Sequence, residues 1–284
     1  MSLTANFYAG DDDKLWRTYV PITGTHLLHP DDGDLVRVWQ DEATPATRNL
    51  AWILVAEDAS RPTFREPGLM RLPSLDFDGT DDRWLLWDNV AGSAKALSAL
   101  FANSSKTMIT ALRIQGAGSN AANIYDNTAV FCDANGNFGL HLKTMAGVHT
   151  LYGYNYDGTA DVTAGVTVSL DTDYVVMIRH GTGTLTLSVL SGDGGETRVD
   201  ESVASGNTSD VAAQCKMGAN YTNAQHFNGC IGQTYCDNTD LGSDNTPLDD
   251  VIEAWLPPAS SSPTEYARPS LKMSSWQMFS THKV

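Results

Sequence analysis

The stretch that decides the fold is Pro73–Trp87, PSLDFDGTDDRWLLW. In its first half, Leu75 and Phe77 alternate with polar residues, as the two-residue period of a half-buried strand requires. The middle, Asp78–Asp81, is rich in turn residues, because aspartate side chains bond nearby backbone amides and glycine tolerates a positive φ. An apolar run, Trp84–Trp87, follows. The stretch therefore predicts a strand, a tight turn and a second strand.

The rest of the chain repeats this pattern. The runs expected to form strands are 35–40, 106–114, 122–133, 137–143, 148–156, 166–170, 174–180, 185–189, 196–204, 211–221 and 226–236, whereas 49–56 is a mixed apolar run. Asn135-Gly136 is the strongest hairpin signal, and the last two runs are expected to pair as a hairpin. Because no helices separate the runs, we predict an all-β, antiparallel two-sheet sandwich and exclude a parallel α/β fold.

Two extensions are expected to flank the sandwich. We assign residues 1–33 to an N-terminal extension, 34–256 to one domain and 257–284 to a C-terminal extension. Within the domain, Thr246 as N-cap and Pro247 at the first helical position predict one short C-terminal helix over 247–256. The extensions are expected to be held by the domain or by neighbouring subunits.

Composition excludes several classes of partner. The 284 residues carry 34 acidic against 18 basic side chains, a formal charge of −16. Such a chain repels phosphate backbones, so nucleic acid is not an expected partner. No run of about 18 apolar residues exists, so no membrane association is expected. The first residues lack a signal-peptide pattern, and the four cysteines are expected to be buried thiols.

Several motifs occur in one order along 34–256. They are Val38-Trp39-Gln40-Asp41, Arg61-Pro62-Thr63, LDFDGTDD at 75–82, the strand 174–178 followed by His180-Gly181, LTLSV at 185–189 and FNGCIGQTYCDNTDL at 227–241. Together they resemble the LamG-like, concanavalin A-like jelly-roll family, in the versions found in bacteriophage virion proteins and bacterial surface proteins. The resemblance implies two antiparallel sheets of about six or seven strands each. It also implies glycan or calcium binding at loops on one rim or on the concave face.

Three tyrosines suggest a ligand-binding face. Tyr152, Tyr154 and Tyr156 lie at alternate positions, so they project from the same face of one strand, and Asp157 follows them. A row of phenol rings can stack on sugar rings while the hydroxyl groups bond sugar hydroxyls. The alternative is an aromatic ladder covered by the extensions or by a neighbouring subunit.

The aspartates of the opening stretch allow three interpretations. Asp78, Asp81 and Asp82 could hold calcium, because hard cations prefer several oxygen ligands. Asp76-x-Asp78-x-x-Asp81 also resembles the Glu-x-Asp-x-x-Glu strand of related β-glucanases, in which two carboxylates act as nucleophile and acid. This sequence departs from that motif at both outer positions. The interpretation favoured here is structural, with the carboxylates bonding turn amides.

No other catalytic set is evident. The sequence has no G-x-S-x-G, Walker A, G-x-G-x-x-G or H-E-x-x-H motif. We therefore expect a protein that is not an enzyme and requires no cofactor, with Ca²⁺ as the one candidate ion.

The leading functional hypothesis is a bacteriophage virion structural protein, a head decoration or appendage subunit. It would be made in the host cytoplasm and assembled as a homo-oligomer. The extensions 1–33 and 257–284 would contact neighbouring virion subunits, and the lectin-like jelly roll would face a cell-surface glycan. One alternative is a free bacterial carbohydrate-binding or adhesion module, and another is a glycoside hydrolase.

Overall fold

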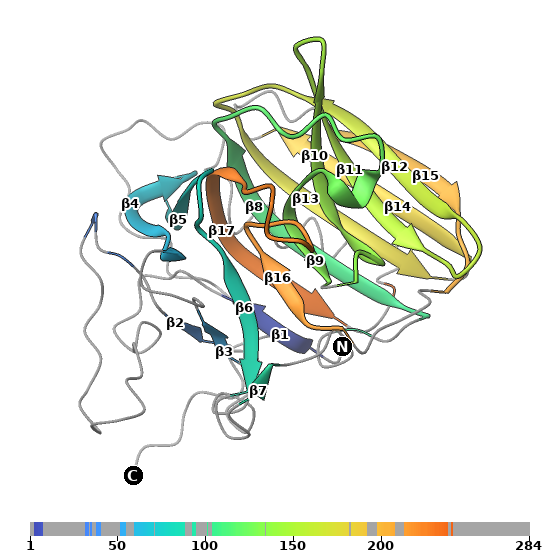
Figure 1. The fold of residues 1–284 in the computed structure, drawn as a ribbon, viewed down its shortest axis with the longest axis horizontal. Coiled ribbons are helices and arrows are strands. Elements are labelled where there is room, and N and C mark those ends of the chain that lie inside the picture. The colour runs from blue at the N-terminus through green and yellow to red at the C-terminus, as the bar shows by residue number, and fades with distance from the viewer. Residues whose placement is uncertain are drawn as a thin grey trace.

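The protein folds as a sandwich of two antiparallel sheets (Figure 1). The structure is a computed structural model that describes residues 3–7, 32–33, 35, 38–40, 52–54, 60–70, 72–88, 93–94, 101, 104–133, 135–181, 183–191, 198–207, 213–237 and 240. The named strands pair antiparallel throughout, which confirms the predicted all-β two-sheet jelly-roll sandwich. In the part of the chain that is described, no helix is long and apolar enough to cross a membrane.

Sheet A has eight strands. Their order is β15 (Arg198–Ala204), β14 (Thr184–Ser191), β13 (Asp173–Gly181), β8 (Lys106–Ile114), β17 (Asn228–Asp237), β5 (Leu72–Asp78) and β4 (Thr63–Leu69), with β1 (Leu3–Phe7) also pairing with β17. The long central strands β13 and β8 pair over eight successive residues without a register shift, from Asp173↔Arg113 to His180↔Lys106.

Sheet B has nine strands, so each sheet is larger than the six or seven strands expected. The order is β12 (Asp161–Val168), β11 (Val148–Tyr156), β10 (Phe138–Met145), β9 (Thr128–Asp133), β16 (Cys215–Met217), β6 (Trp84–Asp88), β3 (Trp52–Leu54) and β2 (Val38–Gln40), with β7 (Ser93–Ala94) pairing with β6. The β9–β10 connection is the predicted Asn135-Gly136 turn, and Gly136 has φ +71°.

The opening stretch joins the two sheets. Its first strand, β5, lies in sheet A and its second, β6, lies in sheet B, so the turn at Asp78–Asp82 crosses from one sheet to the other. The predicted last hairpin is wrong for the same reason, because β16 belongs to sheet B and β17 to sheet A. An alternating pattern shows which residues of a strand are buried. It does not show whether two consecutive strands pair with each other or lie in different sheets.

Apolar side chains from both sheets fill the space between them. The fully buried rings of Phe77, Trp84 and Phe227 meet edge to face, with centroids 6.4 and 6.3 Å from that of Phe77. Phe101 packs in the same way against Phe138, at 5.7 Å. All four cysteines are buried, and no disulfide joins them, as expected for packing thiols.

The flanking segments are described only in part. Within the 1–33 extension, Leu3–Phe7 forms β1 and pairs with β17, so this piece belongs to sheet A. The predicted helix over 247–256 and the 257–284 extension lie outside the described residues.

Candidate functional site

The predicted tyrosine row lies on the outer face of sheet B. Gly153 of β11 faces Ile178 and Leu187 of sheet A, so its even-numbered neighbours point away from the core. Tyr154 is nevertheless only 1% exposed. Its ring meets His141 edge to face, with centroids 5.7 Å apart, so it offers no free face for stacking.

The other two tyrosines of the row remain half-buried. The Tyr152 ring lies over Gly165 of the neighbouring strand, where an added Cβ would come within 2.5 Å of it. Tyr156 ends β11, next to the turn that Asp157 begins. The strand therefore presents two partly exposed tyrosines on either side of a covered one, rather than a platform of three.

Tyr154 is covered by residues that the sequence did not single out. The 3-10 helix η3 (Ile124–Asp126) packs against β10 and β11, and Figure 1 shows it in front of these strands. Its Tyr125 lies 6.3 Å from Tyr154 between ring centroids, and Tyr221 lies 5.5 Å from Tyr125 in an edge-to-face contact. Tyr125 and Tyr221 are both half-exposed. We call Tyr125, Tyr154 and Tyr221 the tyrosine cluster.

The Asn135-Gly136 turn forms the floor of this cluster. A Cβ on Gly136 would lie 3.1 Å from the Tyr125 Cβ and 3.6 Å from the Tyr221 ring, so the rings rest directly on the glycine. Asp133 holds the turn in place, because its carboxylate accepts bonds from the backbone amides of Asn137 and Phe138, both at 2.6 Å.

Hydrogen bonds from two buried side chains hold the loop that carries Tyr221. Asn220 is buried, and its side-chain oxygen accepts bonds from the amides of Ala224 and Gln225, at 2.9 and 3.2 Å. Its Nδ2 donates to the carbonyl of Asp126 at 3.3 Å, which ties this loop to η3. Lys216 Nζ donates to the Tyr221 carbonyl and to Asn223 Oδ1. The backbone segments that carry the two half-exposed rings are therefore held in place by the buried side chains of Asn220 and Lys216.

Two carboxylates bond the phenol groups of the cluster. Tyr154 donates to Asp161 Oδ1 at 2.9 Å. Burial raises the pKa of Tyr154 well above its usual value, and the bond to Asp161 adds to the effect. The pKa of Tyr221 is also raised, by desolvation and by the neighbouring Asp126. Both phenols therefore remain protonated donors near neutral pH.

Asp157 is a turn residue in this structure. Its Oδ1 accepts bonds from the amides of Thr159 and Ala160, each at 2.9 Å, and its Oδ2 accepts one from Gly206 at 3.3 Å. These backbone bonds hold the pKa of Asp157 below its usual value. The contacts satisfy the β11–β12 turn and direct no carboxylate oxygen toward the tyrosine cluster.

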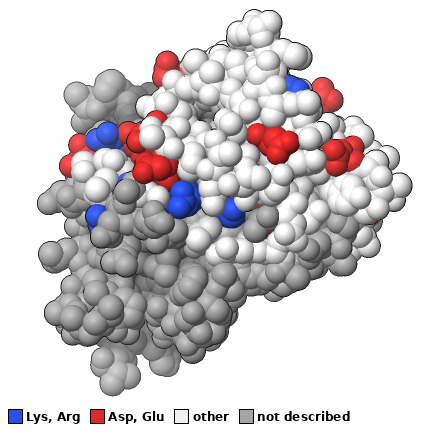
Figure 2. Space-filling view, viewed as in Figure 1, with Lys and Arg blue, Asp and Glu red and all other residues white. Residues whose placement is uncertain are grey.

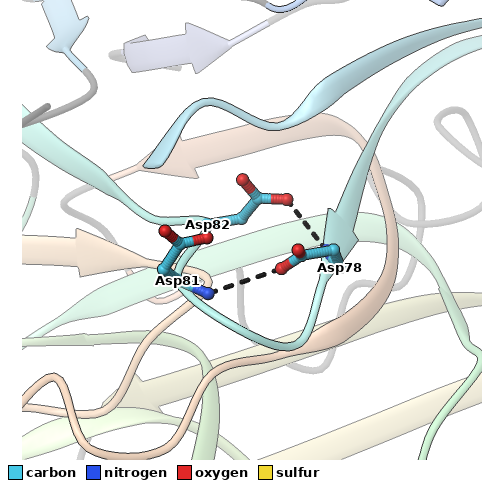
Figure 3. A group of neighbouring side chains, drawn as sticks. All are labelled: Asp78, Asp81 and Asp82. Atoms are coloured by element: carbon cyan, nitrogen blue, oxygen red, sulfur yellow. Dashed lines mark hydrogen bonds between the residues drawn. The ribbon is translucent and has the colours of Figure 1, made fainter. Parts of the chain in front are cut away.

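The structure does bring together the three aspartates proposed as metal ligands (Figure 3). Ligand oxygens of Asp78, Asp81 and Asp82 lie within 4.8 Å of one another. Asp82 is 5% exposed and accepts a bond from the Asp78 amide at 2.8 Å, while Asp78 Oδ1 accepts bonds from Thr80 and Asp81. Burial, together with the charges of Asp78 and Asp81, raises the pKa of Asp82 to about 6, although the bond from the Asp78 amide opposes the rise.

Chemically, this acidic turn suits a hard cation. The carboxylates of Asp78 and Asp82 already accept bonds from turn amides, as the structural interpretation expected, and the three side chains lie side by side at the turn. Asp76, the outer member of the glucanase-like pattern, is instead paired with Arg65 at 2.9 Å. The turn also touches the Tyr221 loop, since His226 bonds the carbonyls of Asp82 and Asn223.

Sequence reasoning missed Tyr125 and Tyr221. Each lies in a short segment rich in asparagine, Asn123–Asn127 and Asn220–Asn223, which reads as a loop. Aromatic residues in polar loops are a recognisable sign of a binding surface, because loops carry most binding residues and burial does not explain these rings. What the sequence could not give was their proximity, since 96 residues separate them along the chain.

No family model matches the chain, and no curated protein does. Among solved structures, it is similar to tailspike protein 2 of Escherichia coli O157:H7 bacteriophage CAB120, at 11% identity and a TM-score of 0.47, covering 63% of this chain and 24% of that one. It is also similar to domain 4 of AbnA, a GH43 extracellular arabinanase from Geobacillus stearothermophilus, in complex with arabinotriose. That likeness has 10% identity and a TM-score of 0.48, and covers 74% of this chain and 94% of that one.

A third similar structure is Trypanosoma rangeli sialidase in complex with sialic acid, at 13% identity and a TM-score of 0.47, covering 87% of this chain and 32% of that one. The chain thus spans about a quarter of the tailspike and a third of the sialidase. The prediction that this protein is not an enzyme is corrected by these findings, because an arabinanase and a sialidase are among the structures that resemble it. At such low identities and TM-scores, the likenesses assign no substrate and no activity, and they do not demonstrate a LamG-like family.

Proposed function

We propose that this chain binds glycans through the tyrosine cluster. The observation that carries the proposal is the pair of half-exposed rings, Tyr125 and Tyr221, whose centroids lie 5.5 Å apart and whose loops are tied together by side-chain hydrogen bonds. A sugar ring can lie on the face of one tyrosine while the other closes its side. Because the rings are already fixed, little side-chain entropy is lost on binding.

Polar groups surround the exposed rings, as hydroxyl recognition requires. Asn135 and Asn223 lie exposed in the two turns beside them, and Asp126 bonds both Asn123 and the Tyr221 phenol. Amide and carboxylate groups at the rim of an aromatic surface bond the hydroxyls of a stacked sugar. The arrangement replaces the predicted row on β11 with a site at the turns of sheet B.

Replacing Tyr221 or Tyr125 by alanine is expected to weaken glycan binding about tenfold each, since one aromatic contact contributes roughly 1–1.5 kcal/mol. A glycan array followed by titration calorimetry on the best ligand measures the effect. Tyr152→Ala is the matched control, because this half-exposed tyrosine lies over Gly165 on the same face, outside the cluster. Loss of binding in Tyr152→Ala with retention in the other two variants would move the site back to β11.

We place this glycan-binding function in a bacteriophage particle, as a decoration or appendage subunit, with a free bacterial adhesion module as the alternative. The sequence motifs shared with jelly rolls of virion proteins support this setting. In it, the 1–33 and 257–284 extensions contact neighbouring subunits. Imaging native particles with a label on the chain tests the setting, and a chain recovered only as a free monomer counts against it.

We also propose that the acidic turn binds Ca²⁺, with Asp78, Asp81 and Asp82 as ligands. Three clustered carboxylates favour a cation, and burial, with a smaller contribution from the neighbouring carboxylate charges, raises the pKa of Asp82 to about 6. A glycosidase pair is a poorer fit at this position, because Asp76, the outer member of the glucanase-like pattern, is engaged in an ion pair with Arg65 at 2.9 Å.

Calcium is expected to raise the melting temperature by about 3 °C or more at pH 7.5, and by less at pH 5, where Asp82 is protonated. Asp82→Asn should abolish the calcium effect. It should also stabilise the calcium-free protein at pH 7.5, because it removes a buried charge whose raised pKa lowers stability as pH rises through about 4 to 6. Thermal melts with Ca²⁺, Mg²⁺ and EDTA measure both effects. An equal calcium shift in Asp82→Asn would contradict the assignment.

A further inference from the structure

Two carboxylates, and no cation, bond the phenol groups of the tyrosine cluster among the contacts of the described residues. Asp161 accepts the Tyr154 hydroxyl, and Asp126 contacts the Tyr221 phenol, so each carboxylate touches the cluster directly. A glycan lying on Tyr125 and Tyr221 would be within about one Debye length, roughly 8–10 Å, of both. Figure 2 shows this face as a mostly uncharged surface, with separate acidic groups over β10–β12 and basic groups nearer its centre.

The basic residue nearest to this loop does not offset that charge. Lys216 is buried, and its ammonium group donates inward to the Tyr221 carbonyl and to Asn223 Oδ1. Burial lowers the pKa of Lys216. On the same face of sheet B, Lys143 lies two residues beyond His141 on β10, toward the hairpin tip and away from the Asn135-Gly136 turn.

Recognition of an anionic sugar normally uses an accessible cation. Carboxylates and sulfates are bound by arginine forks or lysines, whose charge-assisted bonds offset the loss of hydration. The described residues of the tyrosine cluster and its floor supply no exposed arginine or lysine for this purpose. They do supply neutral amides, phenols and carboxylate acceptors, which suit hydroxyl groups.

We infer that the site takes glycans without anionic groups and discriminates against those bearing carboxylate, sulfate or phosphate. This inference rests on the proposed glycan-binding function and names its ligand class. The discrimination comes from Asp126 and Asp161, which repel a ligand anion at low effective dielectric, and from the absence of an exposed cation among the described residues of the cluster.

The test compares matched pairs of oligosaccharides that differ only by an acidic group, such as a neutral hexose oligomer and its uronic acid counterpart. We expect the neutral member to bind at least about tenfold more tightly in 20 mM salt, and the ratio to shrink toward about threefold in 0.5 M salt as charge is screened. Asp126→Asn should shift the ratio about threefold in favour of the acidic member. Asp171→Asn removes the same charge from the turn after β12, on the order of 20 Å along the strand from Asp161, and should leave the ratio unchanged.

The outcomes separate the two proposals. If neither member of any pair binds, the proposed glycan-binding function fails. If both bind but the acidic member binds as tightly or more tightly, glycan binding stands and the inferred ligand class is overturned. If Asp126→Asn and Asp171→Asn shift the ratio equally, the discrimination is a general effect of the acidic chain, and its assignment to the cluster is overturned.

Discussion

Replacing Asp133 by alanine is expected to lower the free energy of unfolding by about 3 kcal/mol or more. Asp133 is fully buried at the end of β9, and its carboxylate accepts bonds from the backbone amides of Asn135, Asn137 and Phe138, at 3.1, 2.6 and 2.6 Å. Alanine leaves these amides without that acceptor, and the Phe138 amide lies in a place that water does not reach. Urea denaturation measures the loss.

Asp157 provides a matched control for this prediction. It also accepts three backbone amides in a hairpin turn, but it lies at the surface, where water can replace the carboxylate. Asp157→Ala should therefore lower the free energy of unfolding much less than Asp133→Ala does. The loss in the free energy of unfolding for Asp133→Asn should lie between those of the two alanine variants, because the side-chain amide keeps one acceptor oxygen and loses the other. Equal losses for the two alanine variants would show that burial does not set the cost.

Asp133→Ala should also weaken glycan binding. Asp133 shapes the turn whose Gly136 supports Tyr125 and Tyr221, so loss of the turn geometry displaces both rings. Binding measured well below the melting temperature of the variant separates this effect from unfolding. An Asp133→Ala protein that is folded and binds normally would show that the floor of the cluster does not position the rings.

The sequence predicts local structure well and sheet membership poorly. Alternation located β10, β11, β13 and β14, and Asn135-Gly136 identified a turn whose backbone requires a positive φ. The connection through Asp78–Asp82 contains the same kinds of turn residue as the Asn135-Gly136 hairpin, yet it joins two sheets. Its strands find partners far away in the chain, β5 with β17 and β6 with β16, and no local pattern encodes those pairings.

In the candidate site, too, local features could be predicted from the sequence and contacts between distant segments could not. Tyr154 was identified from its spacing on β11, but its burial depends on η3, which approaches from 30 residues earlier in the chain. The aspartate cluster could be predicted because all three residues belong to one turn. The tyrosine cluster could not, because its rings come from η3, β11 and the 219–227 loop, and only the folded sandwich brings them together.

Replacing Lys106 by methionine is expected to make the stability of the protein less dependent on pH. Lys106 is fully buried between the sheets, with Nζ 4.6 Å from the centroid of the Phe138 ring. Burial lowers its pKa to about 7, and the charge of Asp133 opposes this only in part. Opposite it on β13, His180 has a lowered pKa, caused by burial and by the Lys106 charge.

The sign of the effect follows from proton binding. Between about pH 7 and 10, the unfolded chain holds a proton on this lysine and the folded protein does not, so stability rises with pH in that window. Below pH 7 the folded protein must carry a buried ammonium group, and its cost is present in full. Methionine has a similar length and no charge, so Lys106→Met should stabilise the protein at pH 6 by about 1–3 kcal/mol. It should also remove the slope between pH 7 and 10.

Lys143 supplies the comparison that isolates burial as the cause. It is a half-exposed lysine on β10, so Lys143→Met changes the net charge by the same amount without removing a buried ammonium group. Urea midpoints measured at pH 6, 7.5 and 9 should converge for wild type and Lys106→Met as pH rises, while Lys143→Met tracks the wild type at each pH. If Lys106→Met is destabilised most at pH 6, the Lys106 charge is a net stabiliser there, and attraction to Asp133 outweighs the cost of burying it.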